Sequence, residues 1–88
     1  MPMRVAVVSP EAEVWSGEAN LVIARTLDGE IGVMAGHVPL LGVLADEGEV
    51  RIRTGGSGDV TVNVNGGFLS VTHDGVSILA ESAELSRG

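Results

Sequence analysis

The side chains of this 88-residue chain that could carry chemistry are serines, two histidines and twelve carboxylates. A nucleophilic serine on a strand-to-helix elbow needs the pattern Gly-x-Ser-x-Gly, and the stretch Gly55-Gly56-Ser57-Gly58-Asp59 fails at its last position. His73 precedes Asp74-Gly75, a pattern typical of a solvated turn rather than of a general base or ligand. Asp46-Glu47 lies beside a glycine and is interpreted as a solvated acidic turn. We therefore expect no catalytic residue.

Missing residue types exclude further classes of site. Without cysteine there is no disulfide, no thiolate nucleophile and no Cys-ligated metal. All five basic residues are arginines, so a Schiff-base or phosphate-loop lysine is absent as well. The net charge of −7 disfavours nucleic acid and anionic lipid as partners. We expect no metal and no cofactor. We also expect no direct membrane insertion, because the longest uncharged stretch, Ile31 to Ala45, is too short to span a bilayer as a helix.

The elements that position these side chains are predicted to be strands. Val50–Arg53 and Asp59–Val64 alternate strictly between apolar and polar residues. Further β-branched runs cover Arg4–Ser9, Asn20–Arg25, Phe68–Thr72 and Val76–Ala80. Glycine turn signals separate them, so the pattern predicts one all-β domain, an antiparallel sandwich or barrel.

Local signals add expectations within this fold. The pairs Asp28-Gly29 and Asp74-Gly75 suit the two central residues of hairpin turns, and Asn65-Gly66-Gly67 predicts another turn. Trp15, the bulkier of two aromatic residues, is expected to be largely buried. The segment 81–85 has helix-forming residues but is too short for a stable helix.

The segment from Asp28 to Leu44 is richer in apolar residues than a turn region requires. As structure alone it would be a strand, a glycine-permitted turn at Gly36-His37 and a second strand. The dense apolar run Val38–Ala45 fits two interpretations, a buried core strand or an exposed surface for a partner. Residue types alone leave both open.

Three sequence blocks resemble the epsilon subunit of F-type ATP synthases. The first is Gly29-Glu30-Ile31-Gly32-Val33, followed by Gly36-His37-x-Pro39-Leu40-Leu41. The second is Gly66-Gly67-Phe68-Leu69-x-Val71, continued by Val76-x-Ile78-Leu79-Ala80-Glu81-x-Ala83-Glu84. The third is the opening, Val7-Val8-Ser9-Pro10-Glu11 with Trp15-Ser16-Gly17-Glu18. The resemblance covers residues 4 to 85 in order and without evident gaps.

The resemblance implies a flattened antiparallel β-sandwich of about ten short strands over residues 1–85. It implies a non-catalytic rotor subunit that binds the gamma subunit and the c-ring and couples proton- or sodium-driven rotation to ATP synthesis, at the cytoplasmic face of a bacterial cell membrane. The positions that would face gamma are Ser9, His37, Leu40, Leu41 and Gly42. The positions that would face the c-ring are Asp28, Gly29 and Glu30.

Two departures from the family pattern stand out. Ala35 replaces the usual proline before the Gly-His pair, which should loosen the turn without abolishing it. Family members generally continue into a helical hairpin that can inhibit ATP hydrolysis and in some binds ATP; here residues 86–88 would be its start, so no ATP binding or inhibition is expected. The alternative to a rotor subunit is a free-standing β-sandwich module that binds a peptide or small ligand through residues 36–44. Co-purification with a gamma-type subunit would separate the two.

Overall fold

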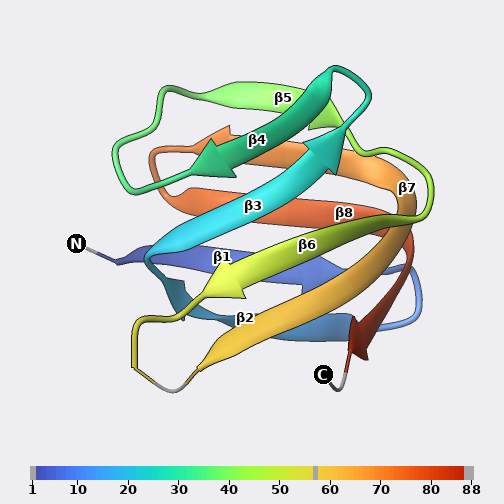
Figure 1. Ribbon diagram of the computed structural model, residues 1–88, viewed down its shortest axis with the longest axis horizontal. Coiled ribbons are helices and arrows are strands. Elements are labelled where there is room, and N and C mark those ends of the chain that lie inside the picture. Colours follow the sequence, from blue (N-terminus) through green and yellow to red (C-terminus); the bar gives the residue numbers. More distant parts are fainter. Residues whose placement is uncertain (1, 57, 87–88) are drawn as a thin grey trace.

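The computed structural model describes residues 2–56 and 58–86, and within them it contains strands and no helix (Figure 1). The eight strands are β1 (Met3–Val8), β2 (Glu13–Ala19), β3 (Leu21–Thr26), β4 (Gly29–Val33), β5 (Leu40–Val43), β6 (Gly48–Arg53), β7 (Asp59–Thr72) and β8 (Gly75–Ser86). The expected all-β class is therefore confirmed. No helix among the described residues could cross a bilayer.

The strands form one sheet that folds over itself into two layers. Their order is β2-β1-β8-β7-β6-β3-β4, and β5 also pairs with β7. The first layer holds β2, β1, the first half of β8, the second half of β7, and β5. The second layer holds the first half of β7 and the second half of β8 with β6, β3 and β4, and Figure 1 shows β3, β4 and β6 in front of the strands of the first layer. The two long strands belong to both layers.

Two details of the expected sandwich need correction. The strands number eight rather than about ten, and β7 continues through Asn65-Gly66-Gly67, where a turn was expected. The pairing is not antiparallel throughout, since β1 and β8 run parallel, with Val5 opposite Val76.

The long strand β7 bends at Gly66-Gly67 instead of turning back. Both glycines have positive φ, +68° and +118°, and a Cβ on Gly67 would clash with the backbone carbonyl of Leu79 on β8. The bend also changes which positions face inward, as β-bulges do. Val62 and Val64 are buried before it, whereas Leu69 and Val71 are buried after it, so the inward set switches from even to odd numbers.

The core lies between the layers and consists of aliphatic side chains. Its largest fully buried members are Leu44, Ile52, Leu69, Ile78, Val5, Val7, Val22, Val33, Val50 and Val62. Trp15 is mostly buried and packs against this core, in line with the expectation that it would be largely buried. Its ring lies over Gly17 on the edge strand β2, where a Cβ would come within 3.0 Å of the ring.

Hairpin geometry differs from the expected turns by one residue. The two-residue loops are Leu27-Asp28 and His73-Asp74, and each glycine, at φ +123° and +140°, is the first residue of the next strand. His73 is exposed in its turn, as expected. Residues 81–85 form the end of β8, because pairing with β7 outweighs the helix propensity of so short a segment. Strand β8 includes Ser86, one residue beyond the expected domain boundary, and residues 87–88 lie outside the described part of the chain.

Candidate functional site: the outer face of the first layer

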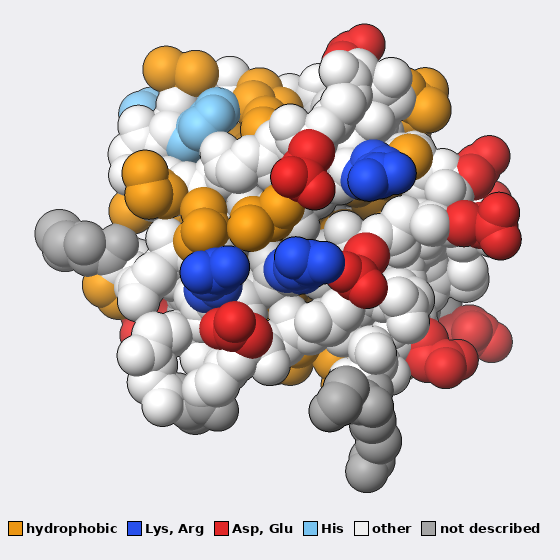
Figure 2. Space-filling view, viewed as in Figure 1, with side chains coloured by type: hydrophobic (Ala, Val, Ile, Leu, Met, Phe, Trp, Pro, Cys, Tyr) orange, Lys and Arg blue, Asp and Glu red, His pale blue; other side chains and the backbone are white. Residues whose placement is uncertain are grey.

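The outer face of the second layer is charged. It carries Arg25, Glu30, Glu49 and Arg51 on strands β3, β4 and β6, and Figure 2 shows basic and acidic side chains side by side on this face. Arg51 Nε donates to Glu49 Oε1 at 2.8 Å, and this hydrogen bond raises the pKa of Arg51 above its ordinary value. Opposite charges neutralise each other across this surface, which is typical of a face exposed to water.

The outer face of the first layer is apolar. Register places Val43, Phe68, Leu79 and Val8 in one row across β5, β7, β8 and β1, and directly opposed side chains share a face. We call this row the apolar ladder. Three of its members are large and roughly half exposed: Val43 at 45%, Phe68 at 49% and Leu79 at 50%. The next row is smaller, with Leu41, Ser70, Ser77 and Ala6 in register.

Beside the ladder lies a hollow of about 560 Å³, here called the apolar hollow. It opens at the end of the sandwich where β7 and β8 bend, with Gly66 and Gly67 among its lining residues. Leu27, 70% exposed at the β3–β4 tip, and the Ser9-Pro10 turn also line it. Its charged lining residues are the carboxylates Asp46 and Glu81. An exposed apolar row next to a hollow of this kind is typical of a protein docking surface.

The structure separates the five residues expected to face a gamma subunit. Ser9 lines the apolar hollow, in a turn closed by its backbone N–H donating to the carbonyl of Ala12 at 2.9 Å. Leu41 is 71% exposed on the outer face, in the row next to the ladder. Leu40 and Gly42 alternate to the other side of β5, where a Cβ on Gly42 would lie 3.4 Å from Thr26 Cγ2.

His37 lies at the opposite end of the strands from Ser9. It follows β4 and lines a smaller hollow with Met3 and Arg4, at the start of β1, whereas Ser9 follows the end of β1. Its backbone N–H donates to the carbonyl of Met34 at 3.0 Å, and Nδ1 of its ring lies 2.6 Å from the Val38 carbonyl oxygen. His37 thus closes the loop that leads into β5, within the expected turn at Gly36-His37.

The three residues expected to face a c-ring lie together at the β3–β4 hairpin. Asp28, Gly29 and Glu30 are all exposed. Thr26 Oγ1 donates to the Gly29 carbonyl at 2.8 Å and accepts the Asp28 N–H at 3.2 Å, and these two hydrogen bonds stabilise the turn. The hairpin presents its carboxylates to solvent.

Sequence reasoning missed most of the apolar ladder. Of the apolar residues that stand exposed on this face or beside it, it named Leu41 and included Val43 in the run Val38–Ala45, but it did not identify Leu27, Phe68 or Leu79. The available signal was that apolar residues fill both alternating positions in parts of β7 and β8, which a strand with one solvated face does not require.

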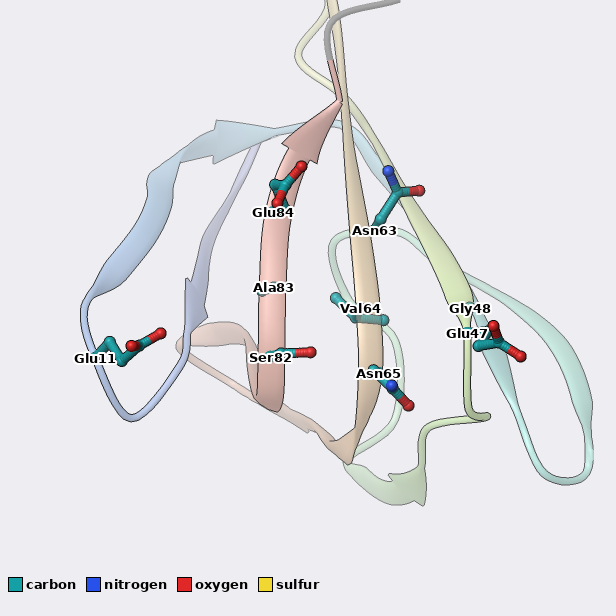
Figure 3. A pocket seen from close by; sticks show the side chains of 9 residues that line it. All are labelled: Glu11, Glu47, Gly48, Asn63, Val64, Asn65, Ser82, Ala83 and Glu84. Atoms are coloured by element: carbon teal, nitrogen blue, oxygen red, sulfur yellow. The ribbon is translucent and has the colours of Figure 1, made fainter.

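A second hollow, of about 530 Å³, is polar and does not form a reactive centre (Figure 3). Asn63, Asn65 and Ser82 line it together with three glutamates. Figure 3 shows Glu11 and Glu47 on opposite sides of it, far from each other. Among residues 2–56 and 58–86, no three His, Asp or Glu side chains come together in a way that could hold a metal ion.

Comparison with known proteins gives a consistent match. Residues 2–86 match the family described as "ATP synthase, Delta/Epsilon chain, beta-sandwich domain". The ATP synthase epsilon chain of Frankia casuarinae is 64% identical over 86 residues, 98% of this chain and 100% of the relative. That of Streptomyces coelicolor is 57% identical over 84 residues, 96% of this chain and 67% of the relative.

Two solved structures share the fold at low sequence identity. A chain in the mitochondrial ATP synthase structure of Euglena gracilis, which comprises OSCP, F1 and the c-ring, matches with a TM-score of 0.86 and 23% identity, covering 96% of this chain and 53% of that one. A chain in the central stalk and c-ring structure of Tetrahymena thermophila ATP synthase matches with a TM-score of 0.75 and 21% identity, covering 94% of this chain and 66% of that one.

Proposed function

Since the chain belongs to the delta/epsilon family of ATP synthase chains, we propose that it is a non-catalytic subunit of the central stalk, joining the gamma subunit to the c-ring and coupling ion-driven rotation to ATP synthesis. The observation that carries the proposal is the apolar ladder with its hollow, because an exposed apolar row of this kind is typical of a surface that another protein covers. Relatives at 64% and 57% identity are epsilon chains.

In this proposal the first-layer face binds gamma. Leu41 contributes apolar area, and Ser9 borders the hollow where the partner enters. Leu40 and Gly42 act from the inner side of β5, and His37 fixes the loop before it, so these three position the surface rather than form its centre. The residues that contribute most to the binding free energy are expected in the ladder itself, because large apolar groups that become buried dominate the energies of interfaces.

The β3–β4 tip binds the c-ring in this proposal. Asp28 and Glu30 offer carboxylates from a hydrogen-bonded turn, and exposed Leu27 beside them adds apolar contact. Such rim contacts contribute roughly 0–1 kcal/mol per ion pair and weaken with salt. The subunit would then lie at the cytoplasmic face of a bacterial cell membrane, held there by the complex and without inserting itself.

Complex formation with the purified gamma subunit of the same ATP synthase tests the gamma contact. We expect the wild-type chain to co-elute with gamma in size-exclusion chromatography, and Leu41→Asp to abolish co-elution. Thr61→Asp is the matched control, because Thr61 lies on β7 opposite Arg51, on the outer face of the second layer. Absence of any complex with gamma would contradict the proposal and favour a free-standing binding module.

Cysteine crosslinking tests the c-ring contact separately. Glu30→Cys should crosslink to cysteines placed in the polar loop of the c subunit within the assembled complex. Asp59→Cys, exposed opposite Arg53 at the end of the second layer that lies away from the tip, is the control and should remain unlinked. Failure of Glu30→Cys across several loop positions would mean that another face of the sandwich meets the ring.

A further inference from the structure

The element that covers the apolar ladder must satisfy its own backbone hydrogen bonds. Strands β7, β8 and β1 already have a paired strand on each side at the ladder. A partner lying across that face therefore finds no free backbone N–H or C=O groups in these three strands, and it cannot extend the sheet there. An α-helix meets this requirement, because all its interior backbone groups are paired within the segment.

The size of the face sets the length of the covering helix. From β5 to β1 the ladder crosses four strands and three inter-strand spacings, which is about 14 Å at roughly 4.8 Å each. A helix rising 1.5 Å per residue covers that distance with about ten residues. The hollow of about 560 Å³, which all four ladder residues line, has room for apolar side chains of such a helix.

Charge determines the chemistry of the flanking residues. The charged residues lining the apolar hollow are both acidic, Asp46 and Glu81, and both are exposed. A second copy of this chain would bring the same carboxylates and a net charge of −7 to the interface, so self-association through this face is opposed. A partner with basic side chains around its apolar stripe is favoured instead.

We propose that the apolar ladder and hollow receive a basic amphipathic helix of the gamma subunit, about ten residues in contact, with an apolar anchor in the hollow and Lys or Arg side chains beside Asp46 and Glu81. This rests on the function proposed above and adds the chemistry of the gamma segment and its position on the face. The helix crosses β5, β7, β8 and β1 along the ladder.

A zero-length carbodiimide crosslink tests the proposal directly. The reagent joins a carboxylate to a lysine amine, and this chain contains no lysine, so a lysine amide on Asp46 or Glu81 can come only from a partner. With the purified complex of this chain and gamma, peptide mapping should find Glu81 or Asp46 linked to a gamma lysine. The linked gamma segment should carry apolar residues at helical spacing, i, i+3 or i+4, and i+7.

Charge variants and a surface footprint complete the test. Glu81→Gln should weaken gamma binding about 2- to 5-fold at low salt and much less at high salt, whereas the control Glu84→Gln, on the same strand but in the polar hollow, should not. Ser77→Cys, next to the ladder, should lose maleimide reactivity when gamma binds, and Asn63→Cys should keep it.

The outcomes separate this proposal from the function itself. Protection of Ser77→Cys by gamma would support the contact with gamma on this face. The basic helix would nevertheless be overturned if Asp46 and Glu81 gave no link to a gamma lysine. It would be overturned as well if the linked gamma segment lacked apolar residues at helical spacing. A complex that leaves Ser77→Cys reactive would move the contact to another face. Absence of a complex would overturn both.

Discussion

Replacing Phe68 by alanine tests the apolar ladder at its centre. The side chain is 49% exposed and lies between Val43 and Leu79. A phenylalanine side chain of roughly 200 Å² then leaves about 100 Å² for a partner to cover, which is worth about 2.5 kcal/mol at roughly 25 cal/mol per Å². We expect the dissociation constant for the gamma subunit to rise about 30- to 70-fold.

Titration calorimetry with purified gamma measures this change, and a thermal melt followed by circular dichroism checks that the variant is folded. Leu85→Ala is the matched control, since Leu85 is 44% exposed but lies near the end of β8, away from the ladder. Its affinity should stay within about 2-fold of wild type, as for a surface change outside the interface. A folded Phe68→Ala chain that binds gamma with wild-type affinity would refute the ladder as the docking surface.

Three further predictions follow from backbone geometry and charge. Gly67→Ala should lower the free energy of unfolding by about 2–4 kcal/mol in urea titrations, because φ is +118° and the backbone of β8 blocks the added Cβ. Gly29→Ala, at φ +123° with open space around it, should lower the free energy of unfolding by only about 1–2 kcal/mol. Equal losses in the two variants would contradict the steric argument. Gly42→Arg should lower the melting temperature by disturbing the contact of β5 with β3. Leu41→Arg should leave the melting temperature unchanged and still block binding of the gamma subunit. The reverse pattern would mean that β5 faces the other way. Titration calorimetry with Mg-ATP at millimolar concentration should show no heat of binding, given no lysine and a net charge of −7, and a micromolar dissociation constant would overturn that expectation.

The strand content of the fold follows from local pattern, but the number and pairing of strands do not. The alternating runs 50–53 and 59–64 became β6 and the first half of β7, as predicted. Positive φ at Gly66-Gly67 serves a hairpin turn and a bend equally well, so the glycines alone cannot distinguish them. The distinction comes from β8, which continues to pair with β7 on both sides of the bend. The parallel pairing of β1 with β8 is likewise non-local, because it joins the two ends of the chain.

The same bend explains why the candidate site could be predicted only at its margins. In Phe68-Leu69-Ser70-Val71 three of four residues are apolar, and hydrophobicity alone would assign the largest of them, Phe68, to the core. The structure buries Leu69 and Val71 and exposes Phe68, because the bend moves the inward set by one position, and a one-residue shift exchanges the two faces of a strand. Had Gly66-Gly67 been interpreted as a bend, Phe68 would follow as an outward residue, and its register with Leu79 would predict the ladder. A turn residue such as Asp28 depends on no such register, which is why local sequence placed it on the surface and could not place the ladder there.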